Sequence, residues 1–227
     1  IYLAALIGKV KKKSGESIIV LWPFFLLTMA LGIILIKQPD IDTLAIILAS
    51  SLTILFISGY PLKNLLLLIF IFSLFGSLVI LTKPYVLERV KTFFADNPDR
   101  QGSAYQVTQS LIAIGSGQWF GRGFGQSSHK FKLLPEPIGD SVFAVAGEEF
   151  GFLGATSIVL AFTWLGLWGI RIASRAPDQF GRLLGMGIIF WIGFQTVVNL
   201  ASMVALMPLT GVPLPFISYG GSAIVVE

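Results

Sequence analysis

The chain has 227 residues, of which 55% are hydrophobic and only 12% are charged, and its mean hydropathy is +0.83. Because soluble domains carry about 25% charged residues, this composition excludes an ordinary soluble globular protein and indicates an integral membrane protein. The net charge of +4 would suit a nucleic-acid-binding protein. Most basic residues, however, lie in short loops between apolar runs, where the positive-inside rule accounts for them, so we expect no nucleic-acid partner. The lack of cysteine excludes disulfides and thiolate metal sites.

The apolar runs predict a series of transmembrane helices, since about 20 apolar residues are needed to cross a bilayer. The first and last runs are cut by the chain ends, which suggests an interior piece of a longer protein. We interpret the whole chain as a single transmembrane domain. Its predicted spans cover residues 1–8 (partial), 18–36, 41–58, 62–82, 141–170, 183–206 and 216–227 (partial).

The basic residues predict the orientation of these spans. Only Lys37 lies in a short loop on the predicted outer side. The short loops on the predicted inner, cytoplasmic side contain Lys9, Lys11, Lys12, Lys13, Lys63, Arg171, Arg175 and Arg182. This asymmetry follows the positive-inside rule.

Residues 83–140 contain no uninterrupted apolar span and form a long predicted outer loop. Residues 86–94 have helical spacing of apolar side chains and are expected to lie along the interface. Residues 104–114 are semi-polar and too short to span, so we predict a partly buried or re-entrant helix there. The sequence therefore predicts an all-α, polytopic helical membrane protein with a long extracytoplasmic loop that contains re-entrant or interfacial helices.

Charged residues are concentrated between Gly115 and Gly154 in a chain that is otherwise poor in charge. If the chain is helical from Ser141 onward, Asp140, Ala144 and Glu148 share one face, with Glu148 about 12 Å deeper. An acidic residue at such depth is a candidate for function. Two alternatives stay open, because Asp140 would also serve as a helix N-cap and Glu148, like Glu149, would also pair with a buried cation.

The same stretch contains the cations Arg122, Lys130 and Lys132 in a glycine-rich loop. Glycines allow backbone N–H groups to approach an oxyanion closely, so this loop could bind the pyrophosphate of a lipid carrier. The alternative is headgroup binding by snorkelling side chains. His129, the only histidine, has no partners at ligand spacing, and no metal site is predicted from it.

Polar and bent segments follow near the end of the chain. Gln195 and Asn199 are four residues apart inside a predicted span and are expected to hydrogen-bond between helices. The segment from Pro208 to Gly221 is rich in proline and glycine. It predicts a bent outer loop that could cap a cavity beside Asp140.

Four stretches together resemble the SEDS family, the FtsW, RodA and SpoVE proteins that polymerise peptidoglycan glycan strands. They are QPD at 38–40, YQxxQSxxAIGSG at 105–117, GxGxGxSxxKxxxLPE with DxxFAVxGEExGFxG at 121–154, and PLTGVPLPFISYGGS at 208–222. The third is more similar to the FtsW and SpoVE branch than to RodA. The chain departs from the family at Asp42, where glycine is usual, and at Ile138 and Gly139, where His-Thr is usual.

The resemblance implies a peptidoglycan glycosyltransferase of the bacterial inner (cytoplasmic) membrane, with its active loop on the outer face. It would polymerise lipid II by inverting transfer with loss of undecaprenyl pyrophosphate, in cell division or cell-shape maintenance. Asp140 then corresponds to the essential carboxylate and would act as general base. The substrate-binding candidates are Arg122, Lys130, Lys132, Glu136, Glu148, Gln109, Ser110 and Ser218.

The resemblance also implies partners: a class B penicillin-binding protein (a transpeptidase) and other divisome or elongasome membrane proteins. A divalent cation, Mg or Mn, could assist the pyrophosphate, although the sequence shows no dedicated ligand set. Two other functions stay open, a lipid II flippase, in which Glu148 and Glu149 would cycle protons, and a non-catalytic division scaffold. The resemblance implies about ten spans, so the chain by itself is expected to be inactive.

Overall fold

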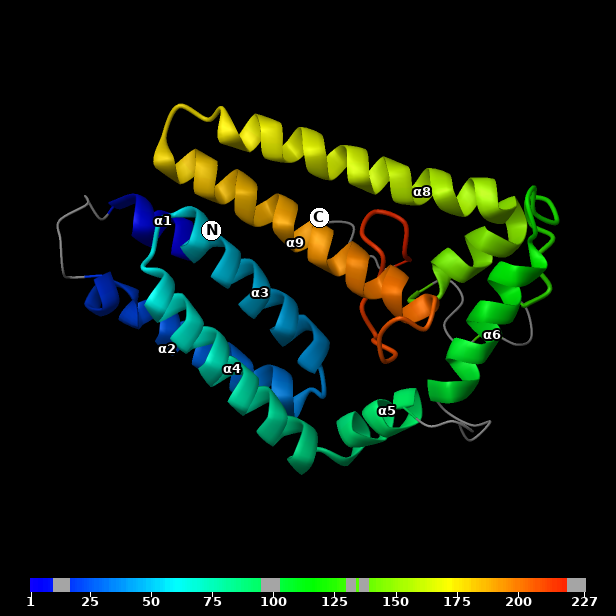
Figure 1. The fold of residues 1–227 in the computed structure, drawn as a ribbon, viewed down its shortest axis with the longest axis horizontal. Coiled ribbons are helices and arrows are strands. Elements are labelled where there is room, and N and C mark those ends of the chain that lie inside the picture. Colours follow the sequence, from blue (N-terminus) through cyan, green and yellow to red (C-terminus); the bar gives the residue numbers. More distant parts are fainter. Residues whose placement is uncertain (10–16, 95–102, 130–133, 135–138, 220–227) are drawn as a thin grey trace. The chain divides into compact units, whose positions relative to one another are not determined.

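The computed structural model describes residues 1–9, 17–94, 103–129, 134 and 139–219, and these residues form helices and irregular segments without a β-strand (Figure 1). The all-α prediction is confirmed. The helices are α1 (Tyr2–Lys9), α2 (Ser17–Lys37), α3 (Ile41–Ile57), α4 (Leu62–Thr82), α5 (Pro84–Phe94), α6 (Ser103–Ser116), α8 (Val142–Ser174) and α9 (Gln179–Met203).

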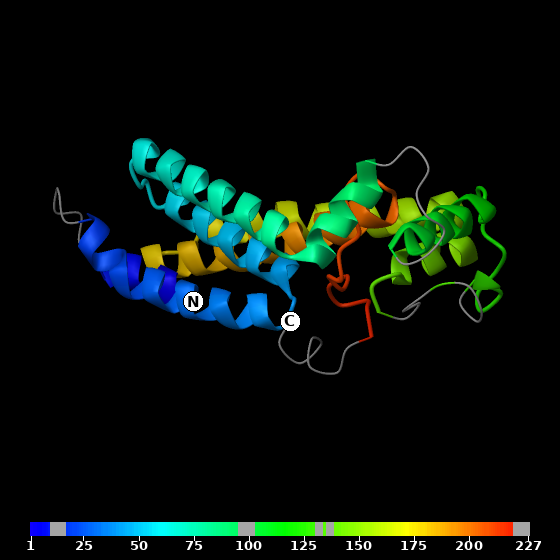
Figure 2. The ribbon, with the colours of Figure 1, turned by 90° about the horizontal axis from the view of Figure 1, so that it is seen from below.

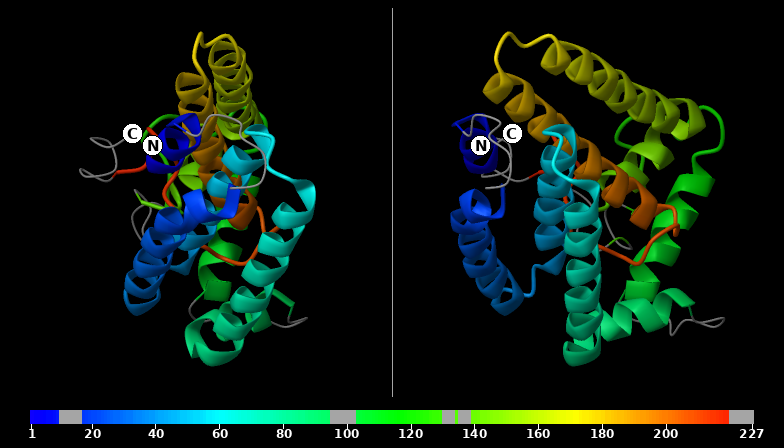
Figure 3. Two further views of the ribbon diagram at one scale, coloured as in Figure 1. Left: turned by 90° about the vertical axis from the view of Figure 1, so that its left-hand side faces the viewer. Right: turned by 60° about the vertical axis from the view of Figure 1, so that its left-hand side comes forward.

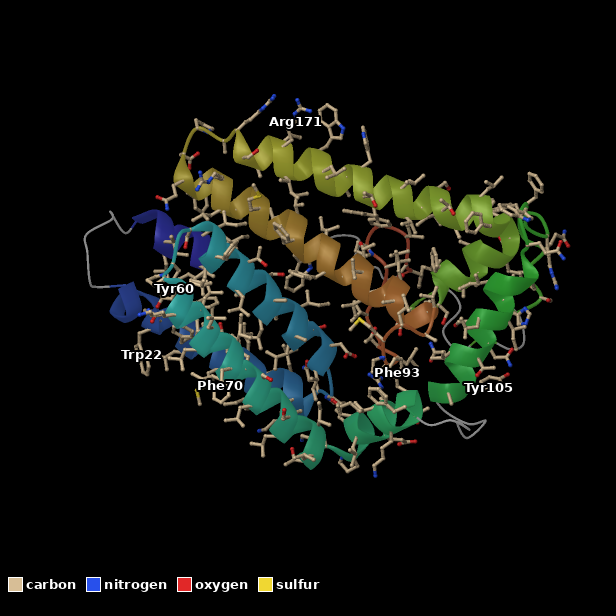
Figure 4. All side chains as sticks on the ribbon, in the orientation of Figure 1. Trp22, Tyr60, Phe70, Phe93, Tyr105 and Arg171 are labelled. Atoms are coloured by element: carbon tan, nitrogen blue, oxygen red, sulfur yellow. The ribbon has the colours of Figure 1, made fainter. Side chains whose placement is uncertain are left out.

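Three of the described helices, α4, α8 and α9, are long and apolar enough to cross a membrane, and α2 and α3 contribute shorter apolar stretches, Trp22–Lys37 and Ile41–Ile57. The chain is thus a membrane protein with several transmembrane-length helices. Large apolar side chains lie on the outside of these helices, as Figure 4 shows for Trp22 and Phe70. Such exposure is expected where lipid, not water, is the solvent. Which helices cross the bilayer, and in which direction, stays a prediction.

The chain divides into two compact units, and the first comprises residues 1–74 and 164–194. Its core contains Leu3, Phe24, Leu55 and Leu183, contributed by α1, α2, α3 and α9. The end of α8 and the start of α9 form a helical hairpin in this unit (Figure 1).

The second unit comprises residues 75–163 and 195–227 and contains the charged stretch. Its largest buried cluster includes Phe143, Met203 and Leu214, from α8, α9 and the irregular segment after α9. That segment, residues 204–219, is the orange-to-red coil in Figure 2. Helix α6 buries Ala104, Ser110 and Ala113, which confirms a partly buried helix, and α5 buries no residue.

Helix α8 is interrupted at Gly151, where φ is 68° and ψ is −164°. The stretch predicted as a span over 141–170 is therefore not one regular helix, and the bend is visible in Figures 1 and 3. Residues 117–123 supply the backbone hydrogen bonds that the interruption removes. The N–H groups of Arg122 and Gly123 donate to the carbonyls of Glu148 and Glu149 (3.0 Å each), and those of Phe152 and Leu153 donate to the carbonyls of Gln118 and Trp119 (2.7 and 3.2 Å).

Glycine is required where these two segments meet. A Cβ atom at Gly151 would overlap the backbone nitrogen of Gly121, and one at Gly121 would overlap the carbonyl of Glu149. A Cβ at Gly117 would overlap the carbonyl of Gly147 in the same way. Both Gly121 and Gly151 also have positive φ, a conformation that costs other residues energy. Close backbone approach thus explains Gly117, Gly121 and Gly151.

We predict that Gly151→Ala lowers the free energy of unfolding by about 1–3 kcal/mol, because the backbone conformation is strained for alanine and the methyl group would separate α8 from residues 117–123. Gly166→Ala is the matched control on the same helix, since a Cβ there meets no described atom within 4 Å. Unfolding of the full-length protein by SDS titration in mixed micelles measures the difference. Equal stability of the two variants would contradict this explanation of the break.

Candidate functional site

Asp140 lies in a turn before α8, with Ser141 between it and the first helical residue, Val142. Its backbone is held from α9. The side-chain amide of Asn199 donates to the carbonyl oxygens of Asp140 (2.9 Å) and Val212 (2.8 Å). Asn199 is fully buried, and both of its N–H groups are used, so the orientation of the amide follows from its partners.

A second side chain holds the residue before Asp140. The hydroxyl of Ser218 donates to the carbonyl of Gly139 (2.8 Å) and accepts from the N–H of Leu214 (2.7 Å). Two adjacent carbonyls, at 139 and 140, are therefore fixed by side chains from α9 and from residues 204–219. This arrangement pairs backbone carbonyls that no regular helix satisfies.

The polar residues of α9 bind to the irregular segment. Gln195 donates from Nε2 to the carbonyl of Pro213 at 3.1 Å, and Asn199 bonds the backbone as described above. The prediction was that Gln195 and Asn199 hydrogen-bond between helices, whereas the bonds described for them run from α9 to carbonyls of irregular backbone. Their four-residue spacing puts both side chains on the face of α9 against which residues 212–213 lie, and the backbone carbonyls there need donors.

The carboxylate of Asp140 lies beside the proline- and glycine-rich segment. A Cβ atom added at Gly211 would be 3.6 Å from Oδ2 of Asp140. The segment after Pro208 thus lies next to Asp140, and that it caps a cavity there stays a prediction. The side chains of Asn199 and Ser218 fix the backbone, and the carboxylate itself faces Gly211.

Glu148 occupies a different environment, a cage of donors from residues 127–129. Oε2 accepts from the hydroxyl of Ser127 (2.6 Å) and the N–H of His129 (3.4 Å), and Oε1 accepts from the N–H and the hydroxyl of Ser128 (3.3 and 3.1 Å). Nδ1 of His129 is 3.0 Å and Nη1 of Arg122 is 3.4 Å from Oε1. Glu148 is fully buried, whereas the side chain of Arg122 is 45% exposed. The structure thus shows the alternative in which Glu148 pairs with a cation.

Several substrate-binding candidates are placed inside the fold. Glu148 is enclosed as described, and the buried hydroxyl of Ser110 donates to the carbonyl of Gln106 at 2.9 Å. Ser218 is buried, and its hydroxyl both donates and accepts a hydrogen bond. All three side chains use their polar groups in hydrogen bonds within the protein, and their role in substrate binding stays a prediction. Gln109 is half-buried on α6.

The prediction that backbone N–H groups of the glycine-rich loop bind an oxyanion is also corrected, for three residues of the loop. The N–H groups of Gly121, Arg122 and Gly123 donate to protein carbonyls, so they are not available to an oxyanion. Lys130, Lys132 and Glu136 lie outside the described residues, and their role stays a prediction. Within the described ranges, no group of three or more His, Asp or Glu side chains could hold a metal ion.

We predict that Glu148→Gln lowers the free energy of unfolding by about 3 kcal/mol, because the amide nitrogen of glutamine would face donors that the carboxylate satisfies and would leave them buried and unpaired. Glu88→Gln, on the exposed surface of α5, removes the same charge and should change stability by less than about 0.5 kcal/mol. SDS titration of both variants measures the contrast. A similar small loss in both would show that the cage around Glu148 is not a stabilising feature.

We also predict that Asn199→Asp is more destabilising than Asn199→Ala. Aspartate has the same shape but no donor, so a buried carboxylate would face the carbonyls of Asp140 and Val212, whereas alanine leaves those carbonyls unpaired at a cost of about 1–3 kcal/mol. Thermal unfolding in detergent ranks the variants. The reverse order would contradict the donor role of the amide.

The sequence of the chain is similar to those of known proteins. The model of the cell cycle protein family FtsW/RodA/SpoVE matches residues 1–227. The chain is 42% identical over 194 residues to stage V sporulation protein E of Bacillus subtilis, covering 85% of the chain and 52% of that protein. It is 36% identical over 231 residues to the probable peptidoglycan glycosyltransferase FtsW of Marinobacter nauticus, covering 99% of the chain and 58% of that protein. The chain spans about half the length of the curated relatives that it matches.

Solved structures show the same fold. A structure of a peptidoglycan synthase complex that coordinates polymerization and crosslinking matches with a TM-score of 0.74 and 27% identity, over 98% of this chain and 63% of that one. The rod shape determining protein RodA of Thermus thermophilus matches with a TM-score of 0.59 and 27% identity, over 99% of this chain and 56% of that one.

Proposed function

Since the chain belongs to the FtsW/RodA/SpoVE family, we propose that the protein polymerises lipid II into glycan strands as a peptidoglycan glycosyltransferase. The observation that carries the proposal is the placement of Asp140. Its backbone is fixed by Asn199 at 2.9 Å while its carboxylate faces Gly211. A general base needs this combination of a fixed position and a carboxylate that a substrate can approach.

The proposed reaction is a single inverting displacement. The acceptor sugar hydroxyl attacks the anomeric carbon of the donor, and its proton passes to the carboxylate of Asp140. The bond between that carbon and the pyrophosphate oxygen breaks, and undecaprenyl pyrophosphate leaves with the electron pair. Pyrophosphate hardly needs a proton to leave, so the paired carboxylates of glycosidases are unnecessary.

The leaving group requires stabilisation of its developing negative charge. Arg122, half of whose side chain is exposed, is assigned to this task together with Lys130 and Lys132. The contact of Arg122 with Glu148 at 3.4 Å would hold the guanidinium in place. A Mg or Mn ion would add positive charge at the pyrophosphate.

The environment of Glu148 favours this enzyme over a lipid II flippase. Proton-coupled transport would require a carboxylate that gains and loses protons as it meets each side of the membrane. Glu148 is fully buried and its two oxygens accept hydrogen bonds from residues 127–129. A carboxylate held in this way suits a structural role, in which it supports the loop that contains Arg122.

The proposal extends to location and partners. The protein would act in the bacterial inner membrane with the loop 83–140 on the outer face, where lipid-linked precursors are consumed. The match to a structure of a peptidoglycan synthase complex supports a class B penicillin-binding protein as partner, along with other division or elongation proteins. The proposed activity is that of the full-length protein, because the chain spans about half the length of the curated relatives that it matches.

We predict that Asp140→Asn abolishes glycan polymerisation, with a loss of at least about 100-fold, the lower range for removing a general base. The assay uses the full-length protein with its transpeptidase and lipid II in detergent, and gel analysis of the polymer measures the rate. Asp178→Asn, at an exposed residue immediately before α9, is the control and should retain full activity. Wild-type polymer from Asp140→Asn would reject the base assignment, and no polymer from the wild-type protein would favour the flippase or the scaffold.

A further inference from the structure

Two tryptophans and an arginine form a stripe along the end of α8, in the first unit. Trp164, Trp168 and Arg171 are spaced by four and three residues, which puts them on one face of the helix. The ring centroids of Trp164 and Trp168 are 5.9 Å apart. The guanidinium of Arg171 lies over the ring of Trp168, 5.7 Å from its centroid. The three side chains therefore form a connected stack.

The stack faces away from the core of the first unit. The other side of α8 packs on α9, because a Cβ atom at Gly169 would overlap the side chain of Ile189. Trp164 and Trp168 are 64% and 48% exposed, and Figure 4 shows Arg171 on the side of α8 that points away from α9. The stack is thus presented to the surroundings of the protein.

Positive charge dominates the turn that follows the stack. Arg171, Arg175 and Arg182 are exposed, and within the described residues they form no ion pair. The only acidic residue between positions 150 and 226 is Asp178. Its carboxylate accepts a hydrogen bond from the N–H of Gly181 at 2.9 Å and so caps the start of α9. Three guanidinium groups therefore stand against one carboxylate at this turn.

We propose that the stack binds an anionic phospholipid such as phosphatidylglycerol. The phosphodiester would lie on Arg171 and Arg175, and the glycerol and the upper acyl chains would lie along Trp168 and Trp164. The inference concerns the membrane around the protein and does not depend on the proposed function.

The order of side chains along α8 matches the order of groups in a phospholipid. A guanidinium is planar and offers paired N–H donors to a phosphate, and it stacks on aromatic faces. At 1.5 Å per residue, Trp168 and Trp164 are about 4.5 and 10.5 Å from Arg171 along the helix axis. The headgroup region on each side of the hydrocarbon core is about 5–8 Å thick. With the phosphate on Arg171, Trp168 would therefore lie beside the glycerol and Trp164 beside the first carbons of the chains.

A simpler explanation covers only part of this arrangement. The positive-inside rule accounts for arginines in the turn, but not for a guanidinium held on an exposed tryptophan, since a free arginine side chain would extend toward water. An acidic segment of another protein would need the cations but not the apolar rings beside them. The combination of both therefore favours a lipid.

The test measures lipid binding at the stack itself. In full-length protein in which Trp164 and Trp168 are the only tryptophans, phosphatidylglycerol with brominated acyl chains should quench the fluorescence at lower concentration than brominated phosphatidylcholine. Arg171→Gln should raise the half-quenching concentration of phosphatidylglycerol about fivefold, the effect of one arginine near an anionic lipid surface, and should leave that of phosphatidylcholine unchanged. Arg89→Gln is the matched control, because Arg89 also lies over an aromatic ring, that of Tyr85 at 5.8 Å, but belongs to α5 in the second unit. No change is expected from it.

Arg171→Lys keeps the charge and should retain most of the preference for phosphatidylglycerol, whereas a loss equal to that of Arg171→Gln would reject recognition by charge. Native mass spectrometry of full-length protein with all its tryptophans, titrated with the same two lipids, repeats the comparison. Equal affinity of the wild type and Arg171→Gln for phosphatidylglycerol would overturn the proposal, as would an equal loss for both lipids. Glycerol phosphate that binds as tightly as the lipid would show a site for a soluble phosphate ester instead. Unchanged lipid binding with loss of a co-purifying membrane protein would assign the stack to a protein contact.

Discussion

The need to pair backbone polar groups in an apolar environment is the constraint on which this structure depends. Two segments of the second unit are not regular helix, the break at Gly151 and residues 204–219. Without water, unpaired N–H and C=O groups at such places cost several kcal/mol each. The first is paired by the backbone of residues 117–123, and the second by side chains that include Gln195, Asn199 and Ser218.

The two acidic residues beside these irregular segments, Glu148 and Asp140, have different roles. Glu148 precedes the break, and its carboxylate accepts hydrogen bonds from Ser127, Ser128 and His129. Asp140 has its backbone bound by Asn199, which leaves the carboxylate to face Gly211. The same chemical group is therefore a fixed structural element in one place and a proposed reactive group in the other.

Length and hydropathy were sufficient for much of the fold. The apolar run over 62–82 coincides with α4, and the semi-polar stretch over 104–114 forms the partly buried α6. The break in α8 could not be read from the chain, because Gly151 adopts its conformation through contacts with residues far earlier in the sequence. Likewise Asn199 was visible as a polar residue in a span, but its partners, Asp140 and Val212, are set by tertiary structure. Asp140 was identified as the candidate base through its resemblance to a family motif. Its position before a predicted helix was equally compatible with an N-cap and could not have distinguished the two roles.

The order of these segments along the chain has a consequence for biosynthesis. Residues 117–123 leave the ribosome before Gly151, so the broken helix meets its hydrogen-bonding partners as soon as it is made. The residues that fix the carbonyls of Asp140 and Gly139 come much later, at positions 199 and 218. A nascent chain can thus complete the cage around Glu148 while the turn at 139–140 is still untethered. The proposed reactive carboxylate becomes fixed in place only when the last segments of this chain have been inserted.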